Sequence, residues 1–477
     1  MYILADRGMI KNSEKSAKHF ANFNNRSRTM KDLTKGYPAK VILMFAIPLM
    51  CSSILQQLYN MVDSKIVSAY VGTAAFAAVG ATSVVSNTLI GFINGLTQGF
   101  AILVANSFGA KDDKRMRNSV AGTLILTTGI TIVLTVAGLM LIRPILAVLH
   151  TPDDIMENAV SYVRIILAGM AFTALYNVFA NILRAVGDSK TPLYCLTFAV
   201  ILNVGLDLLF VAVFDWGIRG AAYATIVAQA ISGLLCMAYV LVRFRNLLPE
   251  RSEWKVSGEM YSDLTTTGLA MGLMGCIVNI GTIILQSAIN GLGTSIVAAH
   301  TAARRLFDIL MILIYTVGLA MTTYVSQNAG AGRIDRIRQG VWHAHIVSTA
   351  ISTLMIVLCY LIARPVIEWL TSSTDPAIVD PAVFYLKFGV WFFYALGPLF
   401  ILRCTLQGMG CKIIPICSSI LEMLVKIASA AILVPHLQYF GVVLTEPVSW
   451  VLMTTLLAIG YLLNSPEKVL GTVEDNE

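Results

Sequence analysis

Two aspartates inside apolar stretches are the residues of this sequence best suited to chemistry. Asp63 follows Tyr59 and Asn60 in one apolar stretch, and Asp207 comes four residues after Asn203 in another. The four-residue spacing puts the Asn203 amide and the Asp207 carboxylate on one face of a helix. If these stretches cross a membrane, each ionisable group costs at least about 2.5 kcal/mol to insert, which makes both aspartates functional candidates.

Two carboxylates and one amide oxygen that face a partly dry cavity can hold Na⁺ or share a proton. Hard oxygen ligands suit a hard cation, and repulsion between two carboxylates favours uptake of a proton. We therefore interpret Asp63, Asn203 and Asp207 as a candidate cation site, with Na⁺ as the metal it can take. A purely structural alternative remains open, in which Asp63 pairs with Lys65 near the outer interface and Asp207 lies close to the outer water layer.

Neutral polar residues also interrupt the first two apolar stretches. We expect them either to form hydrogen bonds between helices or to line a cavity; they are Gln56, Gln57, Asn60, Asn87, Asn94 and Gln98. Pro48 removes a helical hydrogen bond, so the first stretch can bend there and Pro48 becomes a candidate gating residue. Gly91, Gly95 and Gly99 predict that a neighbouring helix approaches the second stretch closely.

The second half of the chain carries a different set of charges. Glu422 and Lys426 lie four residues apart in the favourable order for an ion pair within a helix. Arg304, Arg305 and Asp308 form a second cluster. These groups predict structural ion pairs, and the alternative gives Glu422 a part in substrate binding.

The composition indicates which elements must position these residues. Hydrophobic residues make up 57% of the 477 residues and charged residues only 13%, against roughly 25% in a soluble domain. This excludes a nucleic-acid binder, a disordered chain and a conventional cytosolic enzyme. Twelve stretches are long enough to cross a bilayer as helices: about 41–70, 78–107, 119–142, 158–184, 193–214, 220–243, 264–291, 298–326, 341–363, 382–408, 415–434 and 445–464.

The basic residues predict the direction of these spans. With a cytoplasmic N-terminus, 24 of the 34 Lys and Arg residues fall in inside segments and three in outside loops. Cytoplasmic loops of membrane proteins carry such an excess. We therefore expect a multi-pass protein of the inner (plasma) membrane with both termini in the cytoplasm.

The chain reads as two copies of one unit. An offset of 221 residues aligns Gly72 with Gly293 and Gly109 with Gly330. Because six spans separate the copies, we expect two parallel six-helix lobes, an arrangement that suits alternating access. The predicted parts are a basic segment 1–40, an N-lobe 41–243, a linker 244–263, a C-lobe 264–464 and a tail 465–477.

Several motifs together resemble the multidrug and toxic compound extrusion (MATE) family over about residues 38–464. The resemblance is carried by the Pro48 to Gly72 stretch, Gly109-Ala110, Leu183 to Pro192, Asn203 to Asp207, Gly220 to Thr225 and Ala298 to His300. It implies a twelve-helix antiporter that expels cationic amphiphilic compounds in exchange for Na⁺ or H⁺. The chain is most similar to the DinF-like branch, which implies a first-lobe cation site at Asp63, Tyr59, Asn203, Asp207 and Thr225. The acidic residues that the NorM-like branch carries in spans 7 and 10 have no match here.

The expected function is thus secondary active multidrug efflux by a monomer, without a cofactor and without nucleic acid. We expect the substrate cavity to be lined by Gln57, Asn60, Asn94, Asn181 and Glu422. A lipid-linked oligosaccharide flippase is the main alternative, kept open by Arg164, Lys387, Arg403 and Lys426. A membrane-embedded enzyme is the third, although the chain has no HExxH or GxSxG motif, and His300, His343 and His345 lie at predicted span ends.

Overall fold

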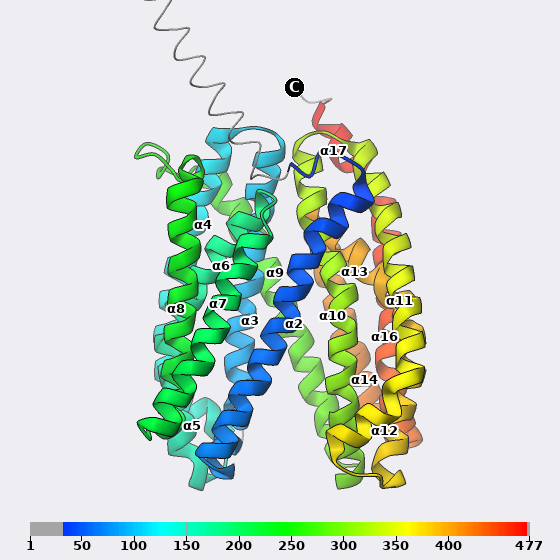
Figure 1. The fold of residues 1–477 in the computed structure, drawn as a ribbon. Coiled ribbons are helices and arrows are strands. Elements are labelled where there is room, and N and C mark those ends of the chain that lie inside the picture. Colours follow the sequence, from blue (N-terminus) through cyan, green and yellow to red (C-terminus); the bar gives the residue numbers. More distant parts are fainter. Residues whose placement is uncertain (1–31, 149–150, 475–477) are drawn as a thin grey trace, which may run out of the picture.

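The computed structural model describes residues 32–148 and 151–474, which are almost entirely helical (Figure 1). In lipid each backbone polar group needs an internal partner, and a helix supplies one within the segment itself. Most of the predicted basic segment 1–40 lies outside the described residues. The long helices of the first half are α2 (Pro38–Tyr70), α3 (Thr73–Gly109), α4 (Asp113–Val148), α5 (Asp153–Ala168), α6 (Met170–Ala185), α7 (Lys190–Asp207) and α8 (Gly217–Arg243).

The second half repeats this series of helices. It comprises α9 (Gly258–Asn290), α10 (Thr294–Gly330), α11 (Ile334–Thr371), α12 (Pro376–Gly389), α13 (Phe393–Gly408), α14 (Ile413–Ala428), α15 (Val434–Leu437), α16 (Tyr439–Leu463) and α17 (Pro466–Glu474). Short π-helical turns follow α7 and α14, namely η1 (Leu208–Val213) and η4 (Ser429–Leu433). Single 3₁₀ turns are η2 (Arg245–Leu247) and η3 (Val390–Phe392).

The described helices match the predicted spans with one difference. Eleven are long and apolar enough to cross a membrane, and α5 with α6 forms a bent pair that brings the number to twelve. The predicted stretch 158–184 is therefore a broken span rather than one straight helix. The two helices bend by 43° at Gly169, where an added Cβ would lie 2.3 Å from the Ile226 side chain.

The helices form two lobes, one from each half of the chain (Figure 1). The predicted repeat is visible in the backbone, because Gly72 before α3 and Gly293 before α10 adopt φ values of 99° and 100°. Glycine adopts this left-handed conformation without the steric cost that a side chain brings. The same local constraint therefore recurs at equivalent places in both halves.

The first helix of each half crosses between the lobes. The first part of α2 buries Ile42 and Phe45 in the core of the C-terminal lobe, whereas Val67 near its end packs in the N-terminal lobe. In Figure 1 α2 runs diagonally across the gap between the lobes. Helix α9 makes the reciprocal crossing, with Leu264 packed in the N-terminal lobe and Leu285 in the C-terminal lobe.

The predicted glycine face of α3 is the surface on which α9 packs. An added Cβ at Gly95 would lie 2.6 Å from the Met271 carbonyl oxygen, and one at Gly99 would lie 2.7 Å from Gly268. Small residues let two helix backbones approach at this distance. The prediction holds for Gly95 and Gly99 but not for Gly91, whose Cβ would meet nothing within 4 Å.

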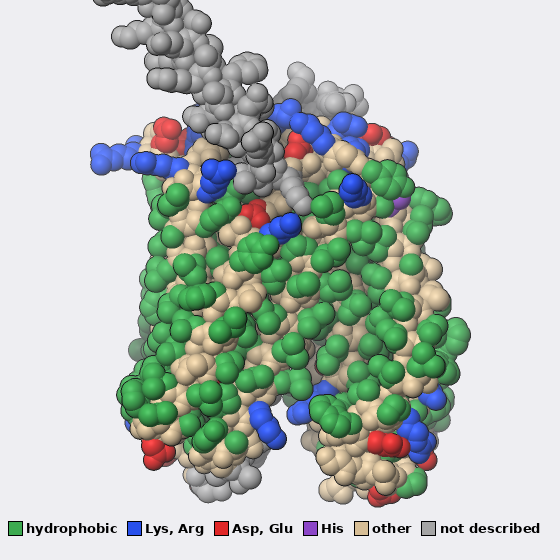
Figure 2. Space-filling view, viewed as in Figure 1, with side chains coloured by type: hydrophobic (Ala, Val, Ile, Leu, Met, Phe, Trp, Pro, Cys, Tyr) green, Lys and Arg blue, Asp and Glu red, His purple; other side chains and the backbone are tan. Residues whose placement is uncertain are grey.

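The lobes meet tightly at the end of the molecule that carries α17. The last turns of α3 and α10 touch there, so that a Cβ at Gly109 would lie 1.9 Å from the Gln327 carbonyl oxygen, and one at Gly330 would lie 1.9 Å from that of Asn106. Gln327 also donates to the Ala185 carbonyl at 2.7 Å. At the opposite end a hollow separates the lobes (Figure 2).

A short connector joins the lobes at this closed end. Helix α9 begins at Gly258, inside the predicted linker 244–263. The connector is held to α4 because Arg117 Nε donates to both Glu253 carboxylate oxygens at 2.9 and 2.8 Å. This hydrogen bond lowers the pKa of Glu253 below its ordinary value of 4.5. The connector is thus held in place against α4 at this end of the molecule.

Candidate functional site

A cavity of about 430 Å³ opens within the N-terminal lobe. Polar side chains of α2 and α3 form much of its wall, including Asn60, Asn87 and Asn94, and α10 closes it with Tyr315. Its charged lining residues, among those described, are Asp63 of α2 and Arg184 of α6. Cavities of this size hold small molecules, and a few placed polar groups orient them.

The structure brings the two predicted aspartates together. The carboxyl groups of Asp63 and Asp207 are direct neighbours. Asp63 lines the cavity, whereas Asp207 and Asn203 have no exposed surface and lie behind it. The expectation that all three groups face a common cavity is therefore wrong for two of them, because α7 buries its polar face against α2 and α8.

The remaining residues of the predicted cation site connect this pair to α8. In the amide orientation that satisfies both of its polar atoms, Asn203 donates to Asp207 Oδ2 at 2.7 Å and accepts from the Thr225 backbone N–H at 3.2 Å. The Tyr59 hydroxyl donates to Thr225 Oγ1 at 3.2 Å. All five predicted residues thus belong to one contiguous cluster on α2, α7 and α8.

This cluster leaves acceptors unsatisfied. The Oδ1 atoms of Asp63 and Asp207 are both buried and have no hydrogen-bond partner in the described structure. Two ionised carboxylates in contact repel each other, and a buried unpaired charge is costly. A proton shared by the pair, or a cation held between them, removes both costs.

The structural alternative for these aspartates does not hold. Lys65 lines a different cavity, whose wall also includes Arg305 and Asp308 of α10. Asp207 is fully buried rather than close to an outer water layer. The chain continues from Asp207 directly into the π-helical turn η1, and turns of this kind are frequent at functional sites.

The predicted lining residues divide among several cavities. Asn60 and Asn94 line the first cavity, and Glu422 lines a second one in the C-terminal lobe. Asn181 faces a small cavity of about 30 Å³ and donates to Thr97 at 3.0 Å. Gln57 is a wrong prediction for the first cavity, because it lines the different cavity that Lys65 also lines, whereas Gln56 lines the first.

Pro48, the predicted gating residue, lies within the unbroken helix α2. The Ser52 hydroxyl donates to the Pro48 carbonyl at 2.9 Å. The structure contains one conformation, so a role of Pro48 in bending stays a prediction.

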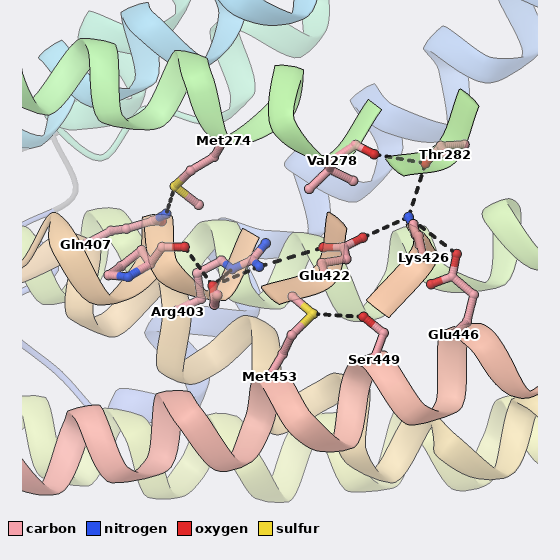
Figure 3. A network of polar contacts seen from close by, with 12 residues as sticks. Met274, Val278, Thr282, Arg403, Gln407, Glu422, Lys426, Glu446, Ser449 and Met453 are labelled. Atoms are coloured by element: carbon pink, nitrogen blue, oxygen red, sulfur yellow. Dashed lines mark hydrogen bonds and ion pairs between the residues drawn. The ribbon is translucent and has the colours of Figure 1, made fainter. Parts of the chain in front are cut away.

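The second cavity, of about 480 Å³, is lined by five described charged residues that form a connected network, namely Arg304, Arg403, Glu422, Lys426 and Glu446. Figure 3 labels all of them but Arg304. Glu422 lies between two cations, with Lys426 Nζ at 3.0 Å and Arg403 Nη2 at 3.9 Å. Glu446 of α16 lies 3.6 Å from Lys426 Nζ and 2.8 Å from Arg304 Nη1. Positive and negative groups therefore alternate along the wall.

The predicted pair Glu422–Lys426 is present, but the larger network was missed. Glu446 could have been found, since it is an acidic residue in the predicted stretch 445–464. Its partner Arg304 lies 142 residues earlier in the chain, which no local spacing indicates. Arg304 also pairs with Asp308 at 2.8 Å, as the predicted cluster implied.

The four basic residues on which the flippase alternative depends do not all lie at one site. Arg403 and Lys426 line the second cavity. Arg164 is exposed on α5 and lines none of the described cavities, and Lys387 lies over the Tyr360 ring at 5.2 Å. Two of the four predicted basic residues thus line a described cavity.

Comparison with known proteins identifies the family. The MatE family model matches residues 48–209 and 270–432, one segment in each lobe. The chain is 29% identical to the probable multidrug resistance protein YpnP of Bacillus subtilis, over 80% of this chain and 84% of the relative. It is 27% identical to the probable multidrug resistance protein YoeA of the same organism, over 88% and 92%. A crystal structure of MATE in the bent conformation superposes with a TM-score of 0.85 at 24% identity, covering 94% and 99%. The chain therefore belongs to the MatE family and is a multi-pass membrane transporter rather than an enzyme.

Proposed function

We propose that this protein is a secondary antiporter that exports cationic amphiphilic compounds in exchange for Na⁺ or H⁺. One observation carries the proposal: Asp63 and Asp207 are neighbours beside a cavity, and each has a buried carboxylate oxygen that lacks a hydrogen-bond partner. Such a pair takes up one positive charge, either a proton, a sodium ion or the charged group of a substrate. Competition among these for one site would couple ion entry to drug release.

The distribution of charge supports an orientation for this exchange. Lys and Arg side chains gather at the closed end beside α17 (Figure 2), and cytoplasmic surfaces carry such an excess. In the proposed orientation both chain termini are in the cytoplasm, the membrane is the inner (plasma) membrane, and the hollow faces outward. The protein would work as a monomer without a cofactor, because both lobes of the chain build the cavities.

Transport into proteoliposomes tests the proposal. We expect Asp207→Asn and Asp63→Asn each to abolish efflux of a fluorescent organic cation driven by an ion gradient, since neither amide can take up a proton or hold Na⁺ in the same way. Separate Na⁺ and pH gradients would identify the coupling ion. Asp215→Asn is the matched control, because Asp215 is exposed in the loop before α8, and its φ of 54° suits Asn.

The outcome that contradicts the proposal is undiminished gradient-driven efflux by the Asp207→Asn variant. Correct insertion is checked by size-exclusion profile and melting temperature in detergent. A variant that elutes and melts like the control but does not transport supports the coupling role.

A further inference from the structure

A third cavity, of about 540 Å³, lies at the open end of the molecule, opposite α17. Lys65 from the last two turns of α2 lines one side, Arg305 of α10 lines another, and Trp369 near the end of α11 also contributes. The cavity adjoins the first one, because Asn60 of α2 lines both. Since the end of α2 packs in the N-terminal lobe through Val67 and α10 packs in the C-terminal lobe, a ligand here touches both lobes.

Lys65 and Arg305 are exposed cations without an anionic partner. Neither forms a hydrogen bond or an ion pair with any residue in the part of the chain that the structure describes. Other basic residues at this end are neutralised, since Arg143 pairs with Glu157 at 3.0 Å and Arg364 pairs with two carboxylates at 3.1 Å each. Figure 2 shows Lys or Arg side chains on both sides of the hollow between the lobes. The two cations of the third cavity are therefore available to an anion that is not part of the chain.

The acidic residue of the described wall leaves this positive charge in place. Asp308 lines the cavity, but its Oδ1 lies 2.8 Å from Nε of Arg304. Arg304 does not line the third cavity, so it balances the carboxylate from outside the wall. The third cavity therefore keeps the excess positive charge of Lys65 and Arg305.

The remaining wall is mostly apolar and open to the surroundings. Met61 of α2, Ile309 of α10 and Trp369 of α11 all line the cavity with exposed side chains. Exposed apolar side chains that surround charged groups in this way mark sites of contact with a membrane or a ligand. The wall thus suits an amphiphilic ligand with a negative group, rather than a free ion.

The position along the helices indicates the level of the lipid headgroups. Trp369 lies two residues before the end of α11, and Lys65 lies five residues before the end of α2. At about 1.5 Å per residue, these offsets correspond to roughly 3 and 7 Å, and Trp side chains gather at the boundary between lipid and water. Arg305 lies deeper, eleven residues after the start of α10. Arginine side chains at such positions bury their stems against apolar surface while the charged group reaches toward the headgroups.

We infer that the third cavity binds an anionic phospholipid of the leaflet that surrounds the open end, with its phosphate near Lys65 and Arg305 and an acyl chain along the apolar wall. A free phosphate would meet the same cations but leave the apolar side chains uncovered. A zwitterionic phospholipid carries a positive group of its own, which these cations repel. Basic pockets between membrane helices recognise anionic headgroups. The site differs from the one proposed for ion exchange, and the inference does not depend on that exchange.

Native mass spectrometry of the whole purified protein in a nonionic detergent tests the inference. The two probes are dioleoyl phosphatidylglycerol and dioleoyl phosphatidylcholine, which have the same chains and differ in net charge. We expect Lys65→Gln and Arg305→Gln each to weaken phosphatidylglycerol binding about fivefold, because each basic side chain near an anionic lipid contributes about this factor. Binding of phosphatidylcholine should stay within about twofold. Lys65→Arg and Arg305→Lys keep the charge and should retain the phosphatidylglycerol affinity.

Arg219→Gln is the matched control, because Arg219 is an exposed basic residue at the start of α8, at the same end, and lines none of the described cavities. An equal effect of Arg219→Gln would show diffuse attraction and overturn the inference. Equal weakening of both lipids by Arg305→Gln would show a structural role, and unchanged binding of both lipids would leave no site; either result overturns it too. Excess inorganic phosphate should not displace the lipid, and displacement would show an anion site in place of a lipid site.

Discussion

The closed end of the molecule depends on two glycines that leave no room for a methyl group. A Cβ at Gly109 would lie 1.9 Å from the Gln327 carbonyl oxygen, and a Cβ at Gly330 would lie 1.9 Å from the Asn106 carbonyl oxygen. These oxygens belong to helix backbones and cannot rotate away. Gly109→Ala or Gly330→Ala should therefore force the lobes apart at this end by about 1 Å, an overpacking that costs roughly 1–3 kcal/mol.

This cost falls on the closed arrangement alone, since the two helix ends do not touch once the lobes separate here. A penalty of roughly 1–3 kcal/mol shifts a two-state equilibrium by about 5- to 150-fold. We expect each variant to favour the conformation that is open at the α17 end. Transport should be slower, because the return to the conformation closed at this end is hindered. The double variant should be more severe than either single one.

Hydrogen–deuterium exchange of the peptides that span Gly109 and Gly330 is the assay, with transport rate as a second readout. Exchange at both peptides should rise in either single variant, because each substitution separates the same contact. Gly80→Ala on α3 is the control, since a Cβ at Gly80 meets nothing within 4 Å. Unchanged exchange and unchanged transport in Gly109→Ala would refute the reasoning.

Two further predictions concern the same end. Gln327→Ala removes the acceptor of the Leu33 N–H at 3.0 Å and the donor to the Ala185 carbonyl. Because each buried group left unpaired costs about 1–3 kcal/mol, we expect faster hydrogen–deuterium exchange at residues 32–37. Gln339→Ala is the control, since Gln339 is exposed and its replacement should leave this exchange unchanged. The Arg117 hydrogen bond lowers the pKa of Glu253, so the tie between linker and α4 should persist as pH falls from 8 to about 4.5 and weaken only as pH passes the lowered pKa. Hydrogen–deuterium exchange at residues 250–257, corrected for intrinsic rates, should follow that profile. In the Glu253→Gln variant the same residues should be unprotected already at pH 7. A loss of protection between pH 7 and 6 in the unmodified protein would contradict the assignment.

Much of the architecture was predictable because a bilayer imposes simple rules. Length and apolarity predict helices, and the alternation of basic loops predicts their direction. The repeated glycines predicted two lobes, and Gly72 and Gly293 adopt nearly the same φ. The bend at Gly169 was missed because hydropathy measures apolarity, and both arms of the broken span are apolar.

The candidate site was predictable only in part. Asn203 and Asp207 share a helix face at four-residue spacing, so their proximity follows from the helix itself. Which surface that face meets does not follow, and α7 turns it inward, behind Asp63. The sequence also placed Gln57 in the cavity, although only the rotation of α2 decides whether Gln56 or Gln57 faces it.

The amino-acid sequence by itself determined the helices, their number, their repeat and the presence of costly charges within them, because these depend on local composition and on spacing within one helix. The tertiary structure alone decided which charges meet. Arg304 and Glu446 are 142 residues apart in the chain, and Arg117 and Glu253 are 136 residues apart. Such contacts depend on how whole helices cross and rotate against one another, and that is set by packing over their full length.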